Sequence, residues 1–202
     1  MNLLAHAYLS FNNDDILAGN MISDYVKGKS KFLYPAGIQE GIALHRAIDT
    51  FTDAHEATKE AKEFFRPYYR LYAGPCIDVV YDHFLANDNN EFASEAALKS
   101  FAAATYKSLA ENKQYMPDKF AVMFPYMQAQ DWLYHYRFKF GIEKSFAGLV
   151  RRSAYLTDSS TAFRVFETNY IPLQQCYNRF FPEVKKMAAD WMDNFTSGTN
   201  TI

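Results

Sequence analysis

Histidine and aspartate side chains recur among apolar residues in two segments of the first half of the chain. Residues 41–55 read GIALHRAIDTFTDAH, in which His45, Asp49 and Asp53 stand four residues apart. On an α-helix, which turns by about 100° per residue, such positions fan over only about 80° of one face. Amphipathic helices also expose polar stripes of this kind to solvent. The spacing alone therefore leaves open a ligand-bearing face and an ordinary exposed one.

The second segment, residues 71–90, favours the ligand interpretation. It contains no Lys or Arg, yet Asp78 and Asp82 stand one helical turn apart and His83 follows directly. Carboxylates among apolar side chains lose hydration energy unless a cation compensates them, and two acids on one face repel each other. A bound divalent metal would supply the missing positive charge.

Further candidate ligands also precede residue 84. Four of the five histidines lie there, and Asp24 stands among apolar residues in NMISDYV. Imidazole and carboxylate ligands without thiolate suit Mn²⁺, Fe²⁺, Mg²⁺ or Zn²⁺, and oxygen-rich ligation favours Mn²⁺ or Mg²⁺. A ferritin-like di-iron centre is not favoured, because no histidine has Glu three residues before it. The motifs GxSxG, GxxxxGK[ST] and GxGxxG are absent.

Composition narrows the class of protein. The 202 residues are 49% hydrophobic and 17% aromatic, so the chain can bury a substantial core in one domain. A formal charge of −2 does not favour general nucleic-acid binding. Two distant cysteines suggest neither a disulfide framework nor a thiolate zinc site, and a reducing cytoplasm is expected. We expect neither a secretory signal nor a membrane span of about 18 apolar residues.

The elements that must position these residues are helices. Apolar positions recur at three- and four-residue steps, and hairpin turns are absent, so the sequence predicts an all-α single domain over residues 1–195 with a flexible tail over 196–202. The expected helices are 2–10, 14 or 15 to 28, 36–53, 56–70 with a kink or end at Pro67, 74–88, 91–113, 117–138, 140–155, and 160–195 with breaks at Pro172 and Pro182.

Four blocks together resemble a known family. MNLLAHAYLS, LAGNMISDYVKG, GIALHRAIDTFTDAH and AGPCIDVVYDHFLA follow one another over residues 1–90 and resemble the acyl carrier protein phosphodiesterases, also called acyl carrier protein hydrolases. The resemblance implies a divergent HD-type helical bundle that hydrolyses the phosphodiester joining 4′-phosphopantetheine to a serine of holo acyl carrier protein. The expected products are apo carrier protein and free phosphopantetheine, and Mn²⁺ is the expected cofactor, with Mg²⁺ or Fe²⁺ as alternatives.

The resemblance also implies site residues. The positions expected to serve the metal are Asp24, His45, Asp49, Asp78, Asp82 and His83. We expect Asp24, His45, Asp82 and His83 to be direct ligands, with Asp49 and Asp78 either completing the set or orienting the histidines.

Three further side chains are candidates for the chemistry. Arg46 would either clamp a phosphate oxygen or pair with Asp49 or Asp53. His55 or His6 would protonate the departing serine oxygen, and the alternative for each is a satisfied structural histidine.

A carrier protein is acidic, so its docking surface should be basic. Arg66 and Arg70, interleaved with aromatic residues, and the pair Arg151 and Arg152 are the candidates, whereas the basic run at 26–31 is expected to be a solvated loop. Two other functions stay open: a phosphohydrolase of the same fold that acts on a nucleotide or small phosphodiester, and a non-enzymatic carrier-protein-binding module.

Overall fold

The computed structural model describes the backbone of residues 1–199 and the side chains of residues 1–195, and within that part it is all-α. The predicted fold class is therefore confirmed. The α-helices are α1 (Leu3–Tyr8), α2 (Asp14–Ile22), α3 (Ala36–Ala54), α4 (Glu56–Tyr69), α5 (Ala73–Ala86), α6 (Glu95–Glu111), α7 (Asp118–Ala129), α8 (Trp132–His135), α9 (Lys139–Arg152), α10 (Ser160–Thr168) and α11 (Tyr170–Thr199). Short 3-10 helices are η1 (Ser23–Tyr25), η2 (Gly28–Leu33), η3 (Arg70–Tyr72) and η4 (Lys113–Tyr115).

Helices α2 and α3 approach until their backbones touch. A Cβ atom added to Gly19 would lie 2.1 Å from the carbonyl oxygen of Ile38, and one added to Gly41 would lie 2.3 Å from that of Ile16. Only glycine fits such an approach, so these two positions set the distance between the helices. The backbone of α2 thereby comes within reach of side chains on α3.

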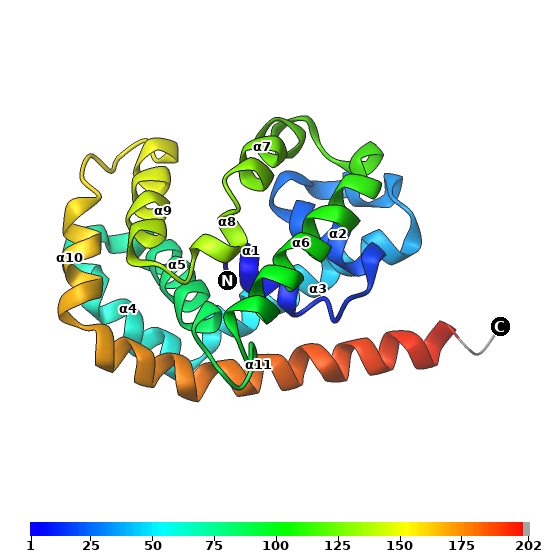
Figure 1. Cartoon of the computed structure of the whole chain (residues 1–202). Coiled ribbons are helices and arrows are strands. Elements are labelled where there is room, and N and C mark those ends of the chain that lie inside the picture. Colours follow the sequence, from blue (N-terminus) through cyan, green and yellow to red (C-terminus); the bar gives the residue numbers. More distant parts are fainter. Residues whose placement is uncertain (200–202) are drawn as a thin grey trace.

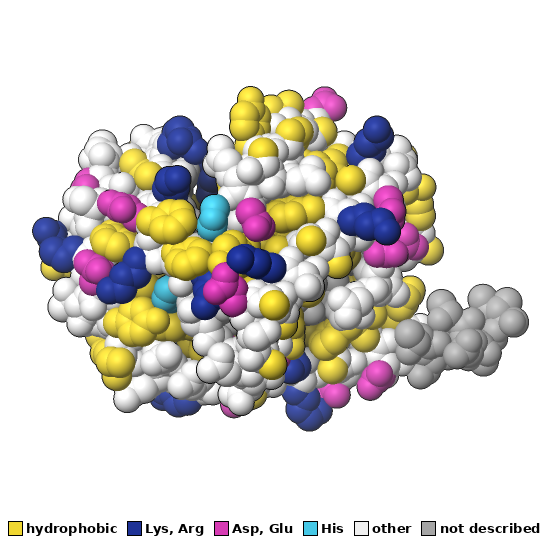
Figure 2. Space-filling model, viewed as in Figure 1, with side chains coloured by type: hydrophobic (Ala, Val, Ile, Leu, Met, Phe, Trp, Pro, Cys, Tyr) yellow, Lys and Arg dark blue, Asp and Glu magenta, His cyan; other side chains and the backbone are white. Residues whose placement is uncertain are grey.

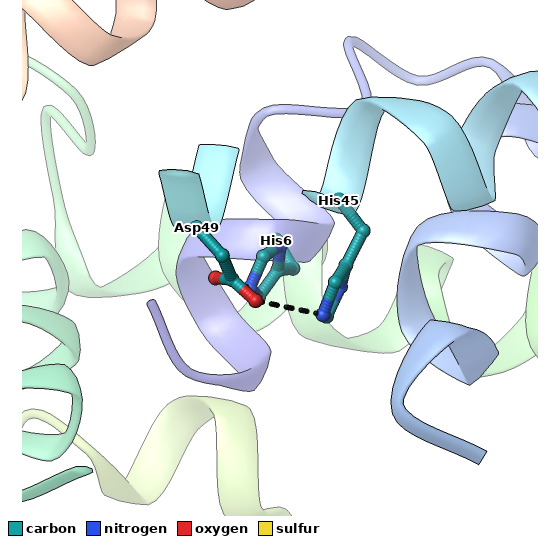
Figure 3. A group of neighbouring side chains, drawn as sticks. All are labelled: His6, His45 and Asp49. Carbon is teal, nitrogen blue, oxygen red and sulfur yellow. Dashed lines mark ion pairs between the residues drawn. The ribbon is translucent and has the colours of Figure 1, made fainter. Parts of the chain in front are cut away.

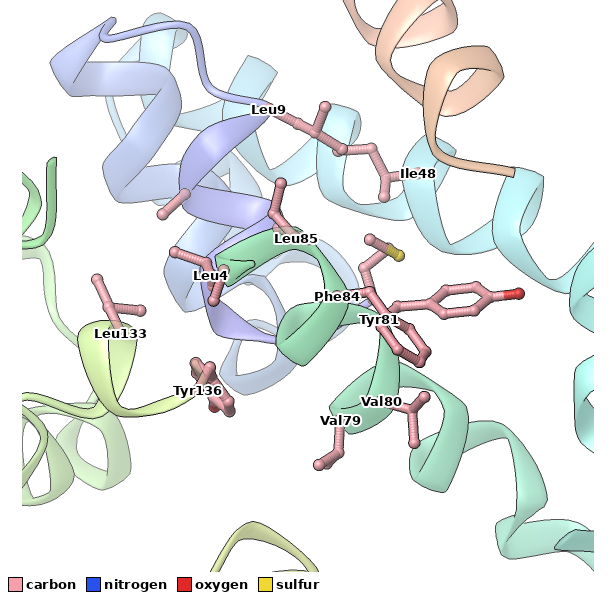
Figure 4. Packing of buried hydrophobic residues seen from close by; sticks show 14 of the residues in the cluster. Leu4, Leu9, Ile48, Val79, Val80, Tyr81, Phe84, Leu85, Leu133 and Tyr136 are labelled. Carbon is pink, nitrogen blue, oxygen red and sulfur yellow. The ribbon is translucent and has the colours of Figure 1, made fainter. Parts of the chain in front are cut away.

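Helix α5 forms the centre of the core and packs against α1, α4 and α9. Its residues Tyr81, Phe84 and Leu85 are buried and belong to the same hydrophobic cluster as Leu4 of α1 and Ile48 of α3 (Figure 4). Burying a side chain of this size contributes about 1.5–3 kcal/mol. The short helix α1 is thus held between α5 and α2.

The remaining helices frame this core. Figure 1 shows α11 running along one side of the molecule, and it packs on α3, α4 and α5. Helices α9 and α7 stand apart, with α8 and the chain's N-terminus between them (Figure 1). None of the helices in the described part of the chain combines the length and apolar character needed to cross a membrane.

Two expected helix boundaries are wrong. The second helix ends at Ile22, and Asp24 lies on η1, because Val26 is buried in an extended conformation and takes the chain out of the helix direction. The helix expected over 117–138 is interrupted at Asp131, which adopts a left-handed conformation with φ +45°. The hydroxyl of Tyr106 accepts a hydrogen bond from the Leu133 amide, which anchors the new start.

The expected proline breaks are also wrong. Pro172 lies in the first turn of α11, where an amide hydrogen would have no helical partner, and the chain breaks at Asn169 instead. Pro182 lies inside α11 between buried Phe181 and Val184, whose packing offsets the lost backbone hydrogen bond. Of the expected tail, residues 196–199 continue α11 and residues 200–202 lie outside the described residues.

Candidate metal centre

Two histidines from different helices form the centre of the site. His6 of α1 and His45 of α3 stack with their ring centroids 3.9 Å apart and their planes 14° from parallel. Both are buried, and Asp49 stands one turn after His45 on α3 with its carboxylate directed at both rings (Figure 3). Asp49 Oδ1 lies 3.3 Å from His6 Nε2, and Asp49 Oδ2 lies 3.1 Å from His45 Nε2.

A second carboxylate reaches the same point from η1. Asp24 Oδ1 lies 3.2 Å from His45 Nε2, so Asp24 and Asp49 flank that nitrogen. The end of α2 before Asp24 makes this possible, because η1 redirects the chain toward α3. His6, Asp24, His45 and Asp49 are called the His–Asp cluster below.

The other ring nitrogens of both histidines are held by Asn20 of α2. His6 Nδ1 lies 2.7 Å from the side-chain oxygen of Asn20, and His45 Nδ1 lies 2.7 Å from its carbonyl oxygen. A carbonyl oxygen can only accept, so His45 donates from Nδ1. Its Nε2 is left to face the carboxylates.

The electrostatics follow from burial and these neighbours. Burial, with the neighbouring His45, lowers the pKa of His6 to about 4. Burial also acts to lower the pKa of His45, but Asp24 and Asp49 outweigh it and raise that pKa to about 9. Despite the opposing effect of burial, the histidines hold the pKa of Asp49 far below its usual range. The cluster therefore stabilises a positive charge between its carboxylates.

The donor set fits a divalent cation. His6 Nε2 is buried and has no hydrogen-bond partner, yet a carboxylate oxygen faces it at 3.3 Å. When Nδ1 carries the proton of a neutral ring, Nε2 and the carboxylate oxygen are both acceptors, and they repel each other unless a cation lies between them. The ligand atoms of His6, His45 and Asp49 all lie within 4.8 Å of one another. Two imidazoles with carboxylates are a set that Mn²⁺, Fe²⁺ and Zn²⁺ accept.

Asp78 borders this cluster without meeting a histidine. The Met1 ammonium lies 3.1 Å from Asp78 Oδ1 and 3.1 Å from Asp49 Oδ1. Burial acts against this charge, but the two carboxylates raise the pKa of the ammonium to about 10. Asp78 therefore extends the acidic wall of the site.

The structure does not bring Asp82 and His83 to the His–Asp cluster. The buried Asp82 carboxylate accepts hydrogen bonds from the amides of Leu4 at 2.7 Å and Ala5 at 3.1 Å, which are first-turn amides of α1. His83 donates from Nδ1 to the carbonyl oxygen of Tyr136 at 2.8 Å, and its Nε2 lies 3.0 Å from the Tyr170 hydroxyl. Both side chains are satisfied by the protein itself, and Asp82 fixes the helix that carries His6.

Of the three candidates for the chemistry, His6 lies in the cluster, whereas Arg46 and His55 lie apart from it. Arg46 is exposed and donates to the carbonyl oxygen of Val26 at 3.1 Å. His55 accepts a hydrogen bond from the Ala57 amide at the start of α4, and its Nε2 lies 3.3 Å from Glu183 Oε2.

The cluster opens into a cleft of about 760 Å³. His6, Asp24 and His45 line one side, and residues of α8 and α9 line the other, among them Arg151 and Arg152. Figure 2 shows Lys and Arg side chains over α9 beside a hollow in the surface. Arg66 and Arg70 lie in a second hollow of about 710 Å³, and both hollows share Pro75.

Three residues of the site were not among the sequence candidates. Asn20 holds both histidines, and His135 and Lys144 line the cleft. Asn20 lies within the block that led to Asp24. Metal-binding histidines commonly donate their second ring N–H to an oxygen acceptor, so an Asn in that block could have been named as a candidate for orienting one. His135 and Lys144 lie far along the chain, and nothing in their local pattern marks them.

The fold and the site define an all-α protein with a candidate divalent-metal centre in a cleft. Comparison with known proteins gives the family: the family model described as acyl carrier protein phosphodiesterase matches residues 1–184. The chain belongs to this family, as its four blocks predicted.

Named relatives agree over nearly the whole chain. Acyl carrier protein phosphodiesterases of Enterobacter sp. (strain 638) and Klebsiella pneumoniae are each 32% identical over 188 residues, covering 93% of this chain and 97% of theirs. That of Salmonella dublin is 31% identical over 189 residues, covering 94% of this chain and 98% of its own. No solved structure matches the chain significantly, so the HD-type relationship stays a prediction.

Proposed function

We propose that this chain is a phosphoric diester hydrolase that removes 4′-phosphopantetheine from the serine of acyl carrier protein. The family match over residues 1–184 carries the proposal, since relatives named for that activity align with 93% of the chain. The His–Asp cluster in a cleft supplies chemistry suited to a phosphodiester. The cleft volume of about 760 Å³ lies in the usual range of about 300–1,000 Å³ for small-molecule sites.

His6, Asp24, His45 and Asp49 would hold a divalent ion, for which we propose Mn²⁺. Their nitrogen and carboxylate atoms are the ones that face one another in the cluster. When bound, such an ion lowers the pKa of its water from about 15.7 to about 7 and offers positive charge to phosphoryl oxygens. Asp78 remains a candidate for orienting this centre, while Asp82 serves it by fixing α1.

The α9 wall of the cleft would bind the substrate's negative charge. Lys144, Arg151 and Arg152 are exposed, and among the described side chains none of them pairs with a carboxylate. Arginine forks match phosphate and carboxylate oxygens. We propose that these three cations meet the phosphodiester and the acidic carrier protein at the mouth of the cleft. Arg66 and Arg70, across Pro75, would extend this docking surface.

The test is the mass of holo acyl carrier protein before and after incubation with this protein and Mn²⁺. We expect a loss of one phosphopantetheine group that a chelator abolishes. Asp49→Asn should reduce both Mn²⁺ affinity and turnover by more than the roughly 10- to 100-fold that loss of an outer hydrogen bond costs.

Asp53→Asn is the matched control, because Asp53 lies one turn further along α3 and pairs with Lys62 at 2.6 Å outside the cluster. It should retain Mn²⁺ affinity, which is the readout of this control because Asp53 lines the same hollow as Arg66 and Arg70. An unchanged carrier-protein mass beside tight Mn²⁺ binding would refute the proposed substrate and direct attention to nucleotides and small phosphodiesters. Carrier-protein binding without hydrolysis of any phosphodiester would support the non-enzymatic module instead.

A further inference from the structure

Asn20 is the buried residue that touches both histidines of the cluster. Its side chain is fully buried on α2, and all its side-chain polar atoms have partners. Its side-chain oxygen lies 2.7 Å from His6 Nδ1, and its carbonyl oxygen lies 2.7 Å from His45 Nδ1. One residue therefore contacts the same ring atom of two stacked imidazoles.

The hydrogen bonds around Asn20 determine which way its amide group points. Its Nδ2 lies 2.9 Å from the carbonyl oxygen of His6 and 3.1 Å from Ser10 Oγ. The hydroxyl of Ser10 itself donates to the His6 carbonyl oxygen at 2.8 Å, so it is available to accept from Asn20. Because a carbonyl can only accept, the NH₂ group must stand on this side. The Asn20 side-chain oxygen then faces His6.

A proton on His6 Nδ1 follows from this orientation. The Asn20 side-chain oxygen accepts, so His6 Nδ1 must donate. His45 Nδ1 must donate for the same reason, since it faces the Asn20 carbonyl oxygen. A neutral imidazole with its proton on Nδ1 presents a lone pair at Nε2, which in both rings is the atom directed at Asp49.

We propose that Asn20 is a positioning residue that holds both histidines of the cluster with Nε2 directed at the metal position, His6 through its side chain and His45 through its carbonyl oxygen. This proposal depends on the proposed function in one respect only, namely that a metal ion binds at that position. Histidine ligands are commonly oriented in this way through their second nitrogen. The close approach of α2 and α3 at Gly19 and Gly41 brings the Asn20 carbonyl oxygen within reach of His45.

The two histidines provide an internal comparison in one experiment. In metal-free, ¹⁵N-labelled protein, long-range ¹H–¹⁵N correlation spectra report which ring nitrogen carries the proton. We expect His6 to carry it on Nδ1. In Asn20→Ala, His6 should lose this preference, whereas His45, which bonds to a backbone oxygen, should keep a proton on Nδ1. Mn²⁺ affinity, measured by calorimetry without carrier protein, should fall roughly 10- to 100-fold.

Ser10→Ala is the matched control. It removes a buried hydrogen bond of the same amide group but leaves the contact between Asn20 and His6. The tautomer of His6 should be unchanged, and Mn²⁺ affinity should stay within about threefold, well short of the loss expected for an orienting contact. Equal losses in both variants would overturn the proposal in favour of general packing.

The wild-type spectrum decides the matter if Asn20→Ala does not fold. A proton on Nε2 of His6 in the metal-free parent would refute the assigned amide orientation and the proposal with it. None of these readouts uses carrier protein. Failure of carrier-protein hydrolysis would therefore refute the proposed function and leave the role of Asn20 intact. A result against the role of Asn20 would likewise leave the proposed function intact.

Discussion

Replacing Gly41 by Ala should separate the two helices that build the metal centre. The added Cβ would lie 2.3 Å from the carbonyl oxygen of Ile16 and 2.9 Å from the Cα of Gly19. Non-bonded heavy atoms favour separations of about 3.5–4.0 Å, so α2 and α3 must move apart by about 1 Å. The obstacles are backbone atoms, which cannot turn aside as a side chain would.

The cost can be estimated from opposing terms. Overpacking a tight interface costs about 1–3 kcal/mol, and a backbone obstacle places this site at the upper end. Replacing a helical glycine by alanine returns up to about 1 kcal/mol. We therefore expect Gly41→Ala to lose about 1–2 kcal/mol of unfolding free energy. The same shift stretches the hydrogen bond from His45 to Asn20, and a misplacement of about 1 Å at a site can cost about 100-fold in activity.

Urea unfolding with chelator present gives the stability, and Mn²⁺ titration together with carrier-protein turnover gives the effect on the site. Gly148→Ala in α9 is the control, because a methyl group there would meet only the ends of the flexible Arg152 and Arg151 side chains, at 3.4 and 3.9 Å, apart from its chain neighbours. It should be at least as stable as the parent and bind Mn²⁺ equally. If Gly41→Ala matched the parent in stability and in Mn²⁺ affinity, the argument that close helix approach positions His45 would be refuted.

Two further predictions concern groups outside the cluster. Burial lowers the pKa of His83 from 6.5 to about 4, so the folded state favours the neutral imidazole. This preference adds at most about 3 kcal/mol to the free energy of unfolding. The added stability is complete above pH 6.5 and is lost as the pH falls toward 4. Thermal unfolding of His83→Gln should accordingly show a shallower pH dependence than the parent in this window, and parallel curves would contradict the assignment. Burial raises the pKa of Cys76 to about 12 and also raises that of Cys176, so both thiols should resist iodoacetamide at pH 8 until urea unfolds the protein. Rapid labelling of the native chain would show that the helices around them open readily.

The sequence predicted the class of fold and several members of the cluster because those signals are local. His45 and Asp49 share a face of α3 through their spacing, and the structure places that face at the cluster. The block around Asp24 pointed to a residue that the structure places beside His45, but on a different element from the expected helix, since Asp24 lies on η1. The helix end at Asp131 was missed because a tertiary contact, the hydrogen bond from the Leu133 amide to the Tyr106 hydroxyl, accompanies it rather than a glycine or proline. At Asn169 the helix ends on a local contact, in which the Asn169 side chain donates to the carbonyl oxygen of Val165.

The contacts of Asp82 and His83 could not be predicted from their spacing, for a different reason. Their positions on α5 show which residues share a helix face, but not which neighbour that face meets. Asp82 meets the free amides that begin α1, and His83 meets a carbonyl oxygen and a hydroxyl. A buried acid needs donors, and backbone amides supply them here, although burial outweighs the two amides and raises the pKa of Asp82 to about 7. The absence of Lys and Arg from residues 71–90 therefore did not by itself require a bound metal ion near these acids.

What separates a structural polar group from a candidate ligand here is whether the protein satisfies the atom. Asp82 and His83 are as deeply buried as His6 and His45, yet each finds donors or acceptors of the correct kind. His6 Nε2 instead faces an acceptor and has no partner, while its Nδ1 is committed to Asn20. An unpaired buried acceptor opposite a carboxylate is costly in a protein interior, and a cation between the two removes the cost. Filling the site should therefore stabilise the fold, and Mn²⁺ should raise the unfolding free energy of the parent more than that of Asp49→Asn.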